Sequence, residues 1–492
     1  MKRHSLLRNA AYYTLSGYIL MPLSLVSSIL MRRWLDPHVY GVIATLNLFV
    51  SYSIFSSLGT LSAAEVSLPF FRGQGALGRM ERLRSASFTF VTIAGTIFSA
   101  GVLAWTVASR KNLDGYLFLG LLVYCFYFLL NQVSSYYVTL LRADGEFVFL
   151  SKYQLFSGML AVAGNPLGVW FFGYRGFLAA SLLGVMLQLY FVYRHVNYLP
   201  AFRIDLGEAR DLLISGIPMF VLGLTAQGMK TVDNLLVLKL LGISQLGYYT
   251  VALMANMLIF SVTNSLSTVL FPAMQESYGK SGNAENLTAY IVRPSIVMGL
   301  VLPLMMGALY FLVPWMVNWL IPRFGPGIPA FRIVTMSTYF FAMTNMTVGY
   351  LISVGKQRQI ILINAATLLL IALIAYLFDR MGLGLSGIAL ATGTGYFCGF
   401  VISSLYVLRH WSGWEEALLF LRDTILPFVY SLFLVVGIGH FLDAGNADRH
   451  FKDAAFLMLV YFVLYTPLMF LFERKTRLYA DVFGPLLRKV FG

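Results

Sequence analysis

The chain has 492 residues, of which 59% are hydrophobic and only 11% are Asp, Glu, Lys or Arg. Soluble domains carry roughly a quarter charged residues, and a soluble chain could not bury so much apolar surface. This composition excludes a soluble enzyme, a nucleic-acid-binding protein and a disordered scaffold. The net charge of +14 comes from basic residues that lie singly or in short clusters between apolar runs, a pattern that orients polytopic membrane proteins.

Apolar runs of about 20 residues, the length that crosses a bilayer, predict an all-α polytopic membrane protein with about fourteen transmembrane helices. The first run is retained as a helix, because no small-residue cleavage site of a signal peptide follows it. Segments on the N-terminal side of the membrane hold about twice as many Lys and Arg as the opposite segments, so both termini are predicted to be cytoplasmic. The expected runs are 10–31, 40–64, 86–108, 116–140, 150–172, 176–194, 212–239, 246–271, 292–313, 331–353, 359–378, 385–408, 424–442 and 453–472.

The two halves of the chain carry a weak repeat. Arg33–Gly41 aligns with Lys239–Gly247 at an offset of 206, and Leu141–Gly145 aligns with Leu351–Gly355 at an offset of 210. Several such matches in the same order predict two pseudo-symmetric six-helix lobes, inserted in the same sense, with two further helices appended. Transporters built from such repeats bind their substrate where the repeats meet, so the repeat favours a carrier over a channel or an enzyme.

The repeat also predicts the domain boundaries. They are an N-terminal six-helix lobe at 1–196, a cytoplasmic connecting loop at 197–211, a C-terminal six-helix lobe at 212–410, two appended helices within 411–473 and a cytoplasmic basic tail at 474–492.

Four short motifs resemble those of a known family. They are Leu35–Gly41, Ser215–Pro218, Asp233–Leu238 and Leu246–Ala252, which lie around the first, seventh and eighth predicted helices. Together they resemble the bacterial Wzx-type oligosaccharide flippases, the polysaccharide branch of the multidrug/oligosaccharidyl-lipid/polysaccharide exporter superfamily. Members of that family often place a basic residue after the aspartate of the seventh helix, where this chain has Asn234.

The resemblance implies a function, a location and partners. The expected cargo is an oligosaccharide repeat unit on a polyprenyl pyrophosphate, moved from the cytoplasmic to the outer leaflet of the bacterial inner membrane by alternating access. The expected partners are this lipid-linked substrate and membrane lipids, together with polysaccharide polymerase or secretion machinery. Two alternatives stay open, a cation-coupled exporter of small amphipathic drugs and a non-transporting membrane subunit of a polysaccharide secretion complex.

The sharpest candidate site lies in the seventh predicted helix. Lys230 and Asp233 are three residues apart and so share a helix face, flanked by Gln227 and Asn234. Ionisable groups inside a membrane are costly and normally face a partner or a wet cavity. One hypothesis is that Lys230 attracts the pyrophosphate or an acidic sugar while Asp233 holds it or titrates. The alternative is a neutralised structural pair near the outer interface.

Other candidates lie nearer the membrane surfaces. Arg33 and Lys239 occupy matched repeat positions at outer helix ends, where they either form a basic rim or extend to lipid headgroups. Glu65 is a candidate proton site at the inner end of the second helix. The arginines of the first cytoplasmic loop either attract an anionic headgroup or only orient the chain; they are Arg72, Arg79, Arg82 and Arg84.

The sequence predicts no enzyme active site, cofactor or metal. Gly382–Gly387 matches a dinucleotide fingerprint only by its letters, because it follows no strand and opens no soluble helix. The two cysteines lie in apolar runs and are expected to be small core residues.

Overall fold

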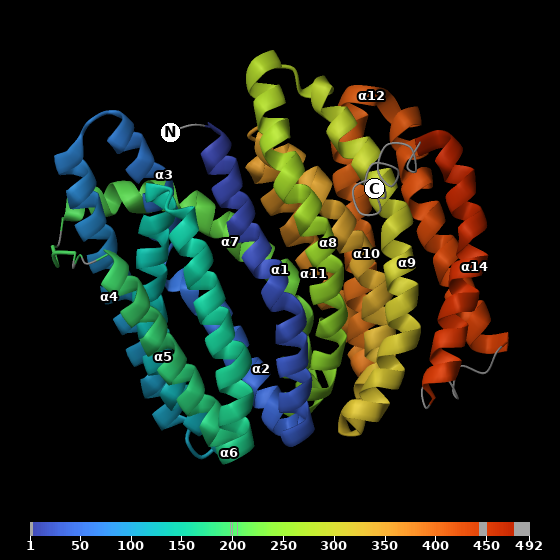
Figure 1. Ribbon diagram of the computed structural model, residues 1–492, viewed down its shortest axis with the longest axis horizontal. Helices are drawn as coiled ribbons and strands as arrows, with labels where there is room; N and C mark the ends of the chain where they lie inside the picture. The colour runs from blue at the N-terminus through green and yellow to red at the C-terminus, as the bar shows by residue number, and fades with distance from the viewer. Residues whose placement is uncertain (1–2, 197, 199, 204, 442–449, 477–492) are drawn as a thin grey trace. The chain divides into compact units, whose positions relative to one another are not determined.

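The computed structural model describes residues 3–196, 198, 200–203, 205–441 and 450–476, and within these ranges every regular element is a helix (Figure 1). The expected all-α fold is therefore confirmed. The basic tail predicted at 474–492 lies almost entirely outside the described residues. The chain divides into two compact units, residues 1–231 and 232–492, and the division falls inside one helix, α7 (Leu206–Leu240). The finer division into six, six and two helices stays a prediction.

Unit 1 consists of long helices packed side by side. Figure 1 shows α4, α5 and α6 as neighbours, and α1 also packs against α6. Apolar side chains from several helices meet in its core, where Leu68, Leu83 and Val192 are almost completely buried. The helices before α7 are α1 (Arg3–Trp34), α2 (Pro37–Ser53), η1 (Ile54–Ser57), α3 (Thr60–Gly73), α4 (Leu77–Ala108), α5 (Gly115–Asp144) and α6 (Phe147–Val196).

The helix α6 is two antiparallel helices joined by a single-residue turn. Gly173 has φ 58° and ψ −138°, which is not helical, and only glycine adopts such a conformation readily. The two halves then lie against each other: the Phe149 and Phe191 rings stack at 5.3 Å, and the backbones approach so closely at Gly168 and Gly176 that a Cβ on either would overlap the other's carbonyl. This confirms the two separate helices predicted at 150–172 and 176–194.

The second predicted helix, 40–64, differs from its structure. It is interrupted after Ser53 by the short 3-10 helix η1, and α3 then continues to Gly73. At the interruption Leu58 has φ 50° and Gly59 has φ 79°, which breaks the right-handed helix. The apolar run hid this break because residues 54–59 stay hydrophobic or small. We call residues 54–59 the α2–α3 break.

Unit 2 repeats the pattern of long packed helices. α12 contains a non-helical residue, Gly413, with φ 80° and ψ −179°, and the Phe400 and Phe420 rings on either side of it lie 6.5 Å apart. α12 is therefore also two helices. The elements of unit 2 are α8 (Ile243–Ser281), η2 (Ala284–Leu287), α9 (Thr288–Leu320), η3 (Pro322–Gly327), α10 (Ile328–Ser353), α11 (Gln357–Arg380), α12 (Gly384–Phe441) and α14 (Phe451–Thr476).

These elements match the expected number of membrane crossings. Within the described residues, eleven helices are long and apolar enough to cross a membrane. This number takes both halves of α6 as one helix and does not include α1 and α10. α1 and α10 have 32 and 26 residues, more than the roughly 20 that span the bilayer core. The chain is therefore a multi-pass membrane protein of about fourteen helices.

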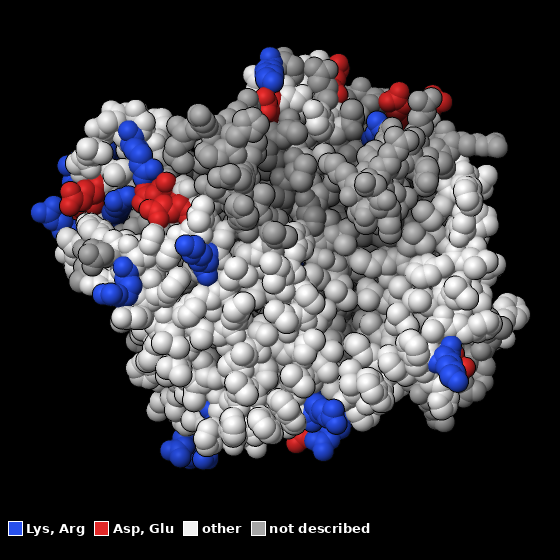
Figure 2. Space-filling model, in the orientation of Figure 1, with Lys and Arg blue, Asp and Glu red and all other residues white. Residues whose placement is uncertain are grey.

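One end of unit 1 carries a cluster of ion pairs, where Figure 2 shows basic and acidic side chains gathered at the left. Arg84 binds both carboxylate oxygens of Asp144, at 3.0 and 3.1 Å, and Arg72 contacts the same carboxylate. Arg79 binds Asp211 at 3.0 Å and lies 3.3 Å from Glu208. These pairs join the ends of α3, α4, α5 and α7.

Candidate functional site

Asp233 is a buried carboxylate in α7. It is 1% exposed, its Oδ2 accepts a 3.0 Å hydrogen bond from the Tyr249 hydroxyl of α8, and its Oδ1 accepts a 2.8 Å bond from the Asn234 N–H. An ionisable group inside a membrane protein is expensive unless polar partners surround it. The sequence did not mark Tyr249 as the partner of Asp233, because this tyrosine lies 16 residues further along the chain, in a different helix.

Asn234 follows Asp233 and is also buried, at 6% exposed. Its side-chain Oδ1 has no hydrogen-bond partner among the described residues. A buried amide oxygen without a partner costs about 1–3 kcal/mol, so this oxygen is a candidate ligand-binding atom. The pair Asp233–Asn234 therefore places one satisfied carboxylate beside one unsatisfied amide.

The other predicted residues of α7 are less enclosed. Lys230 is exposed and Gln227 is half-buried. The Gln227 carbonyl accepts a 2.9 Å hydrogen bond from the Thr231 hydroxyl, which also lies 2.7 Å from the hydroxyl of Tyr52 on α2. Lys230 thus presents its charge at the surface of the helix, while Asp233 is inside. Their shared role at a binding site stays a prediction.

The predicted basic rim residues occupy equivalent helix ends. Arg33 and Lys239 are each the last residue but one of their helices, α1 and α7, and both are exposed. Sequence reasoning missed the neighbouring Arg32, which is only 4% exposed. Arg32 binds Ser28 and lies over the Tyr40 ring, 4.3 Å from its centroid. A run of two arginines gives no sign of which one is buried.

Glu65 lies on α3 and is half-buried, with Oε2 3.9 Å from Nη1 of Arg142. It therefore lies beside a basic partner at the end of unit 1 that carries the ion-pair cluster. The four loop arginines are paired as well, since Arg82 lies 3.7 Å from Glu208 and the others bind Asp144 or Asp211. Charges that are already paired inside the protein are less available to attract an anionic headgroup.

Unit 2 contains a pocket with amide groups, between α8 and α10. Its volume is about 540 Å³, and polar residues Asn264, Ser267 and Asn345 line it beside Phe271 and Met346. Amides offer both donors and acceptors, which suits hydroxyl-rich ligands. We call this the amide pocket.

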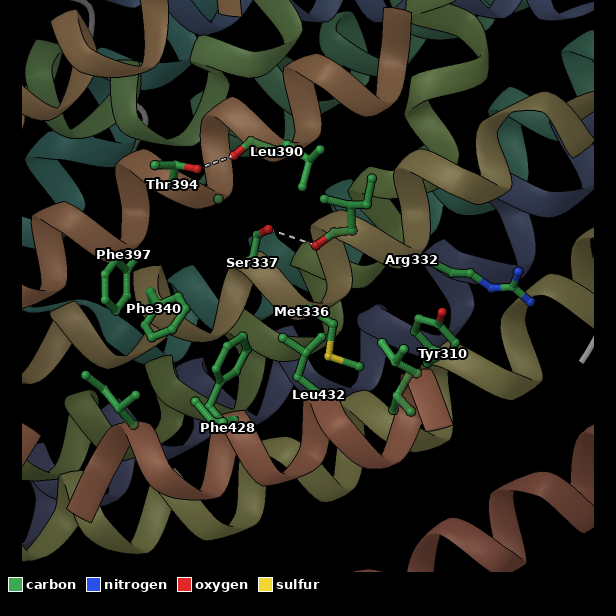
Figure 3. Close-up of a pocket in the computed structure, with 16 residues that line it drawn as sticks. Tyr310, Arg332, Met336, Ser337, Phe340, Leu390, Thr394, Phe397, Phe428 and Leu432 are labelled. Atoms are coloured by element: carbon green, nitrogen blue, oxygen red, sulfur yellow. Dashed lines mark hydrogen bonds between the residues drawn. The ribbon is translucent and has the colours of Figure 1, made fainter. Parts of the chain in front are cut away.

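A second pocket of unit 2 is almost wholly apolar. It also has a volume of about 540 Å³ and lies between α9, α10 and both halves of α12. Figure 3 shows Arg332 and Tyr310 at one end and Phe340, Phe397 and Phe428 at the other. The Arg332 guanidinium lies 5.1 Å from the Tyr310 ring centroid, and lining residues such as Leu432 and Val429 are exposed at 39% and 50%. We call this the apolar pocket.

Within the described residues, no group of three or more His, Cys, Asp or Glu side chains could hold a metal ion. The charged residues of the candidate site are therefore isolated groups beside polar neutral ones. Such a site can bind and position a ligand through charge and hydrogen bonds.

The fold is shared with solved membrane transporters. A multidrug resistance MATE family transporter of the MOP superfamily, in an inward-facing conformation, matches with a TM-score of 0.67 at 16% identity, covering 80% of this chain and 96% of that one. The lipid II flippase MurJ, in an inward closed conformation, matches with a TM-score of 0.68 at 13% identity, covering 94% and 99%. A MOP superfamily transporter from Pyrococcus furiosus has a TM-score of 0.58 at 16% identity, covering 84% and 98%.

This fold defines the class of protein: a multi-pass membrane protein with the architecture of MOP superfamily transporters. Residues 30–322, more than half of the chain, match the family described as polysaccharide biosynthesis protein, and the chain belongs to that family. The resemblance drawn from the helix motifs, to the polysaccharide branch of the superfamily, is thereby confirmed. No curated protein is similar enough in sequence to serve as a relative.

Proposed function

We propose that this protein flips a polyprenyl-pyrophosphate-linked oligosaccharide from the cytoplasmic to the outer leaflet of a bacterial inner membrane by alternating access, with both termini in the cytoplasm. The observation that carries the proposal is a transporter fold in a chain of a polysaccharide biosynthesis family. A sugar headgroup cannot cross hydrocarbon without partners for its hydroxyls. Polysaccharide polymerase or secretion machinery would then take up the flipped cargo.

The amide pocket supports a sugar ligand. Asn264, Ser267 and Asn345 bring neutral donors and acceptors into one cavity of a membrane helix bundle, and Asn345 also donates a 3.4 Å hydrogen bond to Thr263. On the predicted topology this part of α8 and α10 lies in the cytoplasmic half of the membrane. A glycan arriving from the cytoplasm would meet these amides first.

The apolar pocket supports a lipid-linked ligand. Its walls are aliphatic and aromatic, its rim is open, and a single cation, Arg332, stands at one end. This arrangement matches an isoprenoid chain that ends in an anionic pyrophosphate. On the predicted topology Arg332 lies toward the outer face, so the pocket would receive the lipid after transfer.

Leaflet access in proteoliposomes tests the function. Purified protein is reconstituted with a labelled polyprenyl-pyrophosphate oligosaccharide, and a membrane-impermeant quencher or lectin reports the cargo that reaches the other leaflet. We expect transfer that requires the protein and is slowed when Asn264→Leu is introduced. The matched control is Asn47→Leu, an exposed amide on α2 outside the amide pocket.

Other outcomes would change the assignment. Protein-dependent efflux of a small amphipathic cation, with no movement of any lipid-linked glycan, would replace the flippase by a drug exporter. No transport of either ligand, together with co-purification of polysaccharide synthesis proteins, would indicate a non-transporting subunit.

A further inference from the structure

The amide pocket of unit 2 is polar but carries no charge. Every described residue that lines it is uncharged. The sequence of its two walls shows the same property over a longer distance, because no Asp, Glu, Lys, Arg or His occurs in residues 243–275, within α8, or in residues 333–353, within α10. The missing charge is therefore a property of both helices rather than of a single position.

Two asparagines of α8 are placed differently. Asn256 is 9% exposed and accepts a hydrogen bond from the Thr338 hydroxyl of α10, which is how polar residues usually join membrane helices. Asn264 lies further along the same helix, is exposed and lines the amide pocket. A buried amide between two helices serves packing, whereas an exposed amide in a pocket can bind a ligand.

The other two polar residues of the pocket keep part of their hydrogen-bonding capacity. Asn345 Nδ2 donates a 3.4 Å hydrogen bond to the Thr263 hydroxyl, which orients the amide and leaves its Oδ1 as an acceptor. The Ser267 hydroxyl donates to the Thr263 carbonyl at 3.0 Å, and its oxygen can still accept. The pocket thus offers neutral donors and acceptors, and a sugar hydroxyl can both donate and accept.

A charged sugar would fit this pocket poorly. An ionised carboxylate that leaves water needs a counter-charge or several well-placed donors, and the penalty for a buried ion without them is several kcal/mol. An ammonium group needs an anion in the same way. The amide groups of Asn264 and Asn345 supply hydrogen bonds without net charge, so they can replace the hydration of a hydroxyl better than that of an ion.

The one cation of α10 lies away from the amide pocket. Arg332 precedes Asn345 by 13 residues, which is about 20 Å along the helix axis at 1.5 Å per residue. Arg332 lines the apolar pocket instead, beside Tyr310 (Figure 3). Unit 2 therefore keeps its positive charge in the pocket proposed for the lipid pyrophosphate and leaves the amide pocket neutral.

We propose that the amide pocket restricts the cargo to neutral glycans, whose sugars carry hydroxyl or N-acetyl groups but no carboxylate, sulfate or free amine. The proposal rests on the flippase function and names its substrate class. Small-molecule pockets are mostly apolar, with a few polar groups that fix the orientation of the ligand. Phe271 and Met346 are such apolar walls, against which the less polar faces of sugar rings can pack.

Three cargoes that differ only in the charge of one sugar test the proposal in wild-type proteoliposomes. They share the polyprenyl pyrophosphate and the sugar sequence; one sugar is a neutral hexose, the corresponding uronic acid, or the methyl ester of that acid. We expect the neutral cargo to be flipped at least about tenfold faster than the acid, which corresponds to about 1.4 kcal/mol. The ester should recover most of the neutral rate, because it removes the charge without removing bulk.

A variant locates the selection in the amide pocket. Asn264→Lys adds a cation to the pocket, so the ratio of neutral to acidic flipping rates should fall to about twofold, because an opposite charge compensates the carboxylate. Asn47→Lys changes an exposed amide of α2 outside the pocket and should keep the wild-type ratio. Each ratio is measured within one preparation, so it does not depend on how much of the variant folds.

The possible outcomes separate this proposal from the function on which it rests. Equal rates for all three cargoes, or an ester as slow as the acid, would overturn selection by charge and leave the flippase function in place. An unchanged ratio in Asn264→Lys would overturn the amide pocket as its location. No movement of any of the three cargoes would instead remove the flippase function, and the proposed selection with it.

Discussion

The Tyr249 hydroxyl of α8 donates a 3.0 Å hydrogen bond to Oδ2 of Asp233 in α7, and both residues are buried, at 0% and 1% exposed. This bond joins two consecutive helices at the carboxylate that the sequence analysis singled out in the seventh predicted helix. Substitutions that remove the charge of Asp233 or the Tyr249 hydroxyl should reveal whether the carboxylate serves transport or only packing.

We expect Asp233→Asn to reduce the flipping rate at least about tenfold while the protein still folds, since the amide can still accept the Tyr249 bond but carries no charge. Tyr249→Phe removes one hydrogen bond, worth about 1 kcal/mol, and should lower thermal stability while leaving most of the transport rate. Initial rates in proteoliposomes and melting curves in detergent check both. Equal transport by Asp233→Asn and wild type would make the carboxylate purely structural.

Lys230 should act through its charge. Lys230→Ala is expected to weaken apparent affinity for a pyrophosphate-linked cargo about tenfold, which corresponds to about 1.4 kcal/mol, and Lys230→Arg should retain most of it. Lys111→Ala, which removes an exposed lysine in the turn after α4 that belongs to none of the candidate sites, is the matched control. Concentration dependence of initial flipping rates gives the answer. Similar losses from both alanine variants would point to a general surface effect rather than to a binding residue.

Filling the apolar pocket should impair long-chain cargo selectively. Leu432→Trp places a larger side chain against Phe340 and Phe428 in the pocket, so cargo with a full polyprenyl chain should be flipped several-fold more slowly. Cargo on a short isoprenoid should be unaffected. The control is Phe433→Trp, a change at the next residue, which is 75% exposed and does not line the pocket. If short- and long-chain cargo slow equally, the pocket is not a chain site.

The contact between Gly59 and Gly216 should be intolerant of any side chain. Gly216→Ala forces a Cβ to within 2.8 Å of the Gly59 backbone. The free energy of unfolding should fall by more than about 2 kcal/mol, because backbone atoms cannot move aside easily. Gly164→Ala, in α6, meets nothing within 4 Å and should be neutral or slightly stabilising. Thermal denaturation of the two variants in the same detergent gives the comparison.

The ion-pair cluster of unit 1 should matter for stability more than for cargo. Arg84→Ala removes two hydrogen bonds to Asp144 and should cost about 1 kcal/mol, because these partly exposed pairs are screened by solvent. Apparent affinity for the cargo should stay within about twofold of wild type, since that shift is below 0.5 kcal/mol. A loss of affinity without a loss of stability would instead support the alternative that these arginines attract the headgroup.

Much of this fold follows from simple patterns in the sequence. Apolar run length predicts the helices, and Gly173 and the polar stretch at 174–175 mark the turn inside α6. The α2–α3 break was not predictable from hydropathy, because its residues are as apolar and small as those of a continuous helix. The left-handed residues Leu58 and Gly59 lie where Gly59 packs closely on Gly216, a residue far away in the sequence.

The candidate site divides in the same way. A lysine and an aspartate three residues apart in an apolar helix made α7 the sharpest candidate in the sequence, and their role at a binding site stays a prediction. The partner of Asp233 and the burial of Arg32 depend on which helix lies opposite, and a single sequence without long-range contacts does not contain that information. The apolar pocket was hidden for the same reason, since its walls come from α9, α10 and both halves of α12.

The salt bridges of the ion-pair cluster carry a consequence for how the chain is made. Arg72, Arg79 and Arg84 leave the ribosome long before Asp144, Glu208 and Asp211, the acidic residues that later neutralise them. During synthesis these arginines are therefore bare positive charges, which is when charge decides the orientation of the first helices. Once the later helices have been inserted, the same side chains form salt bridges between helix ends. On the predicted topology, one set of residues would thus serve insertion first and assembly afterwards.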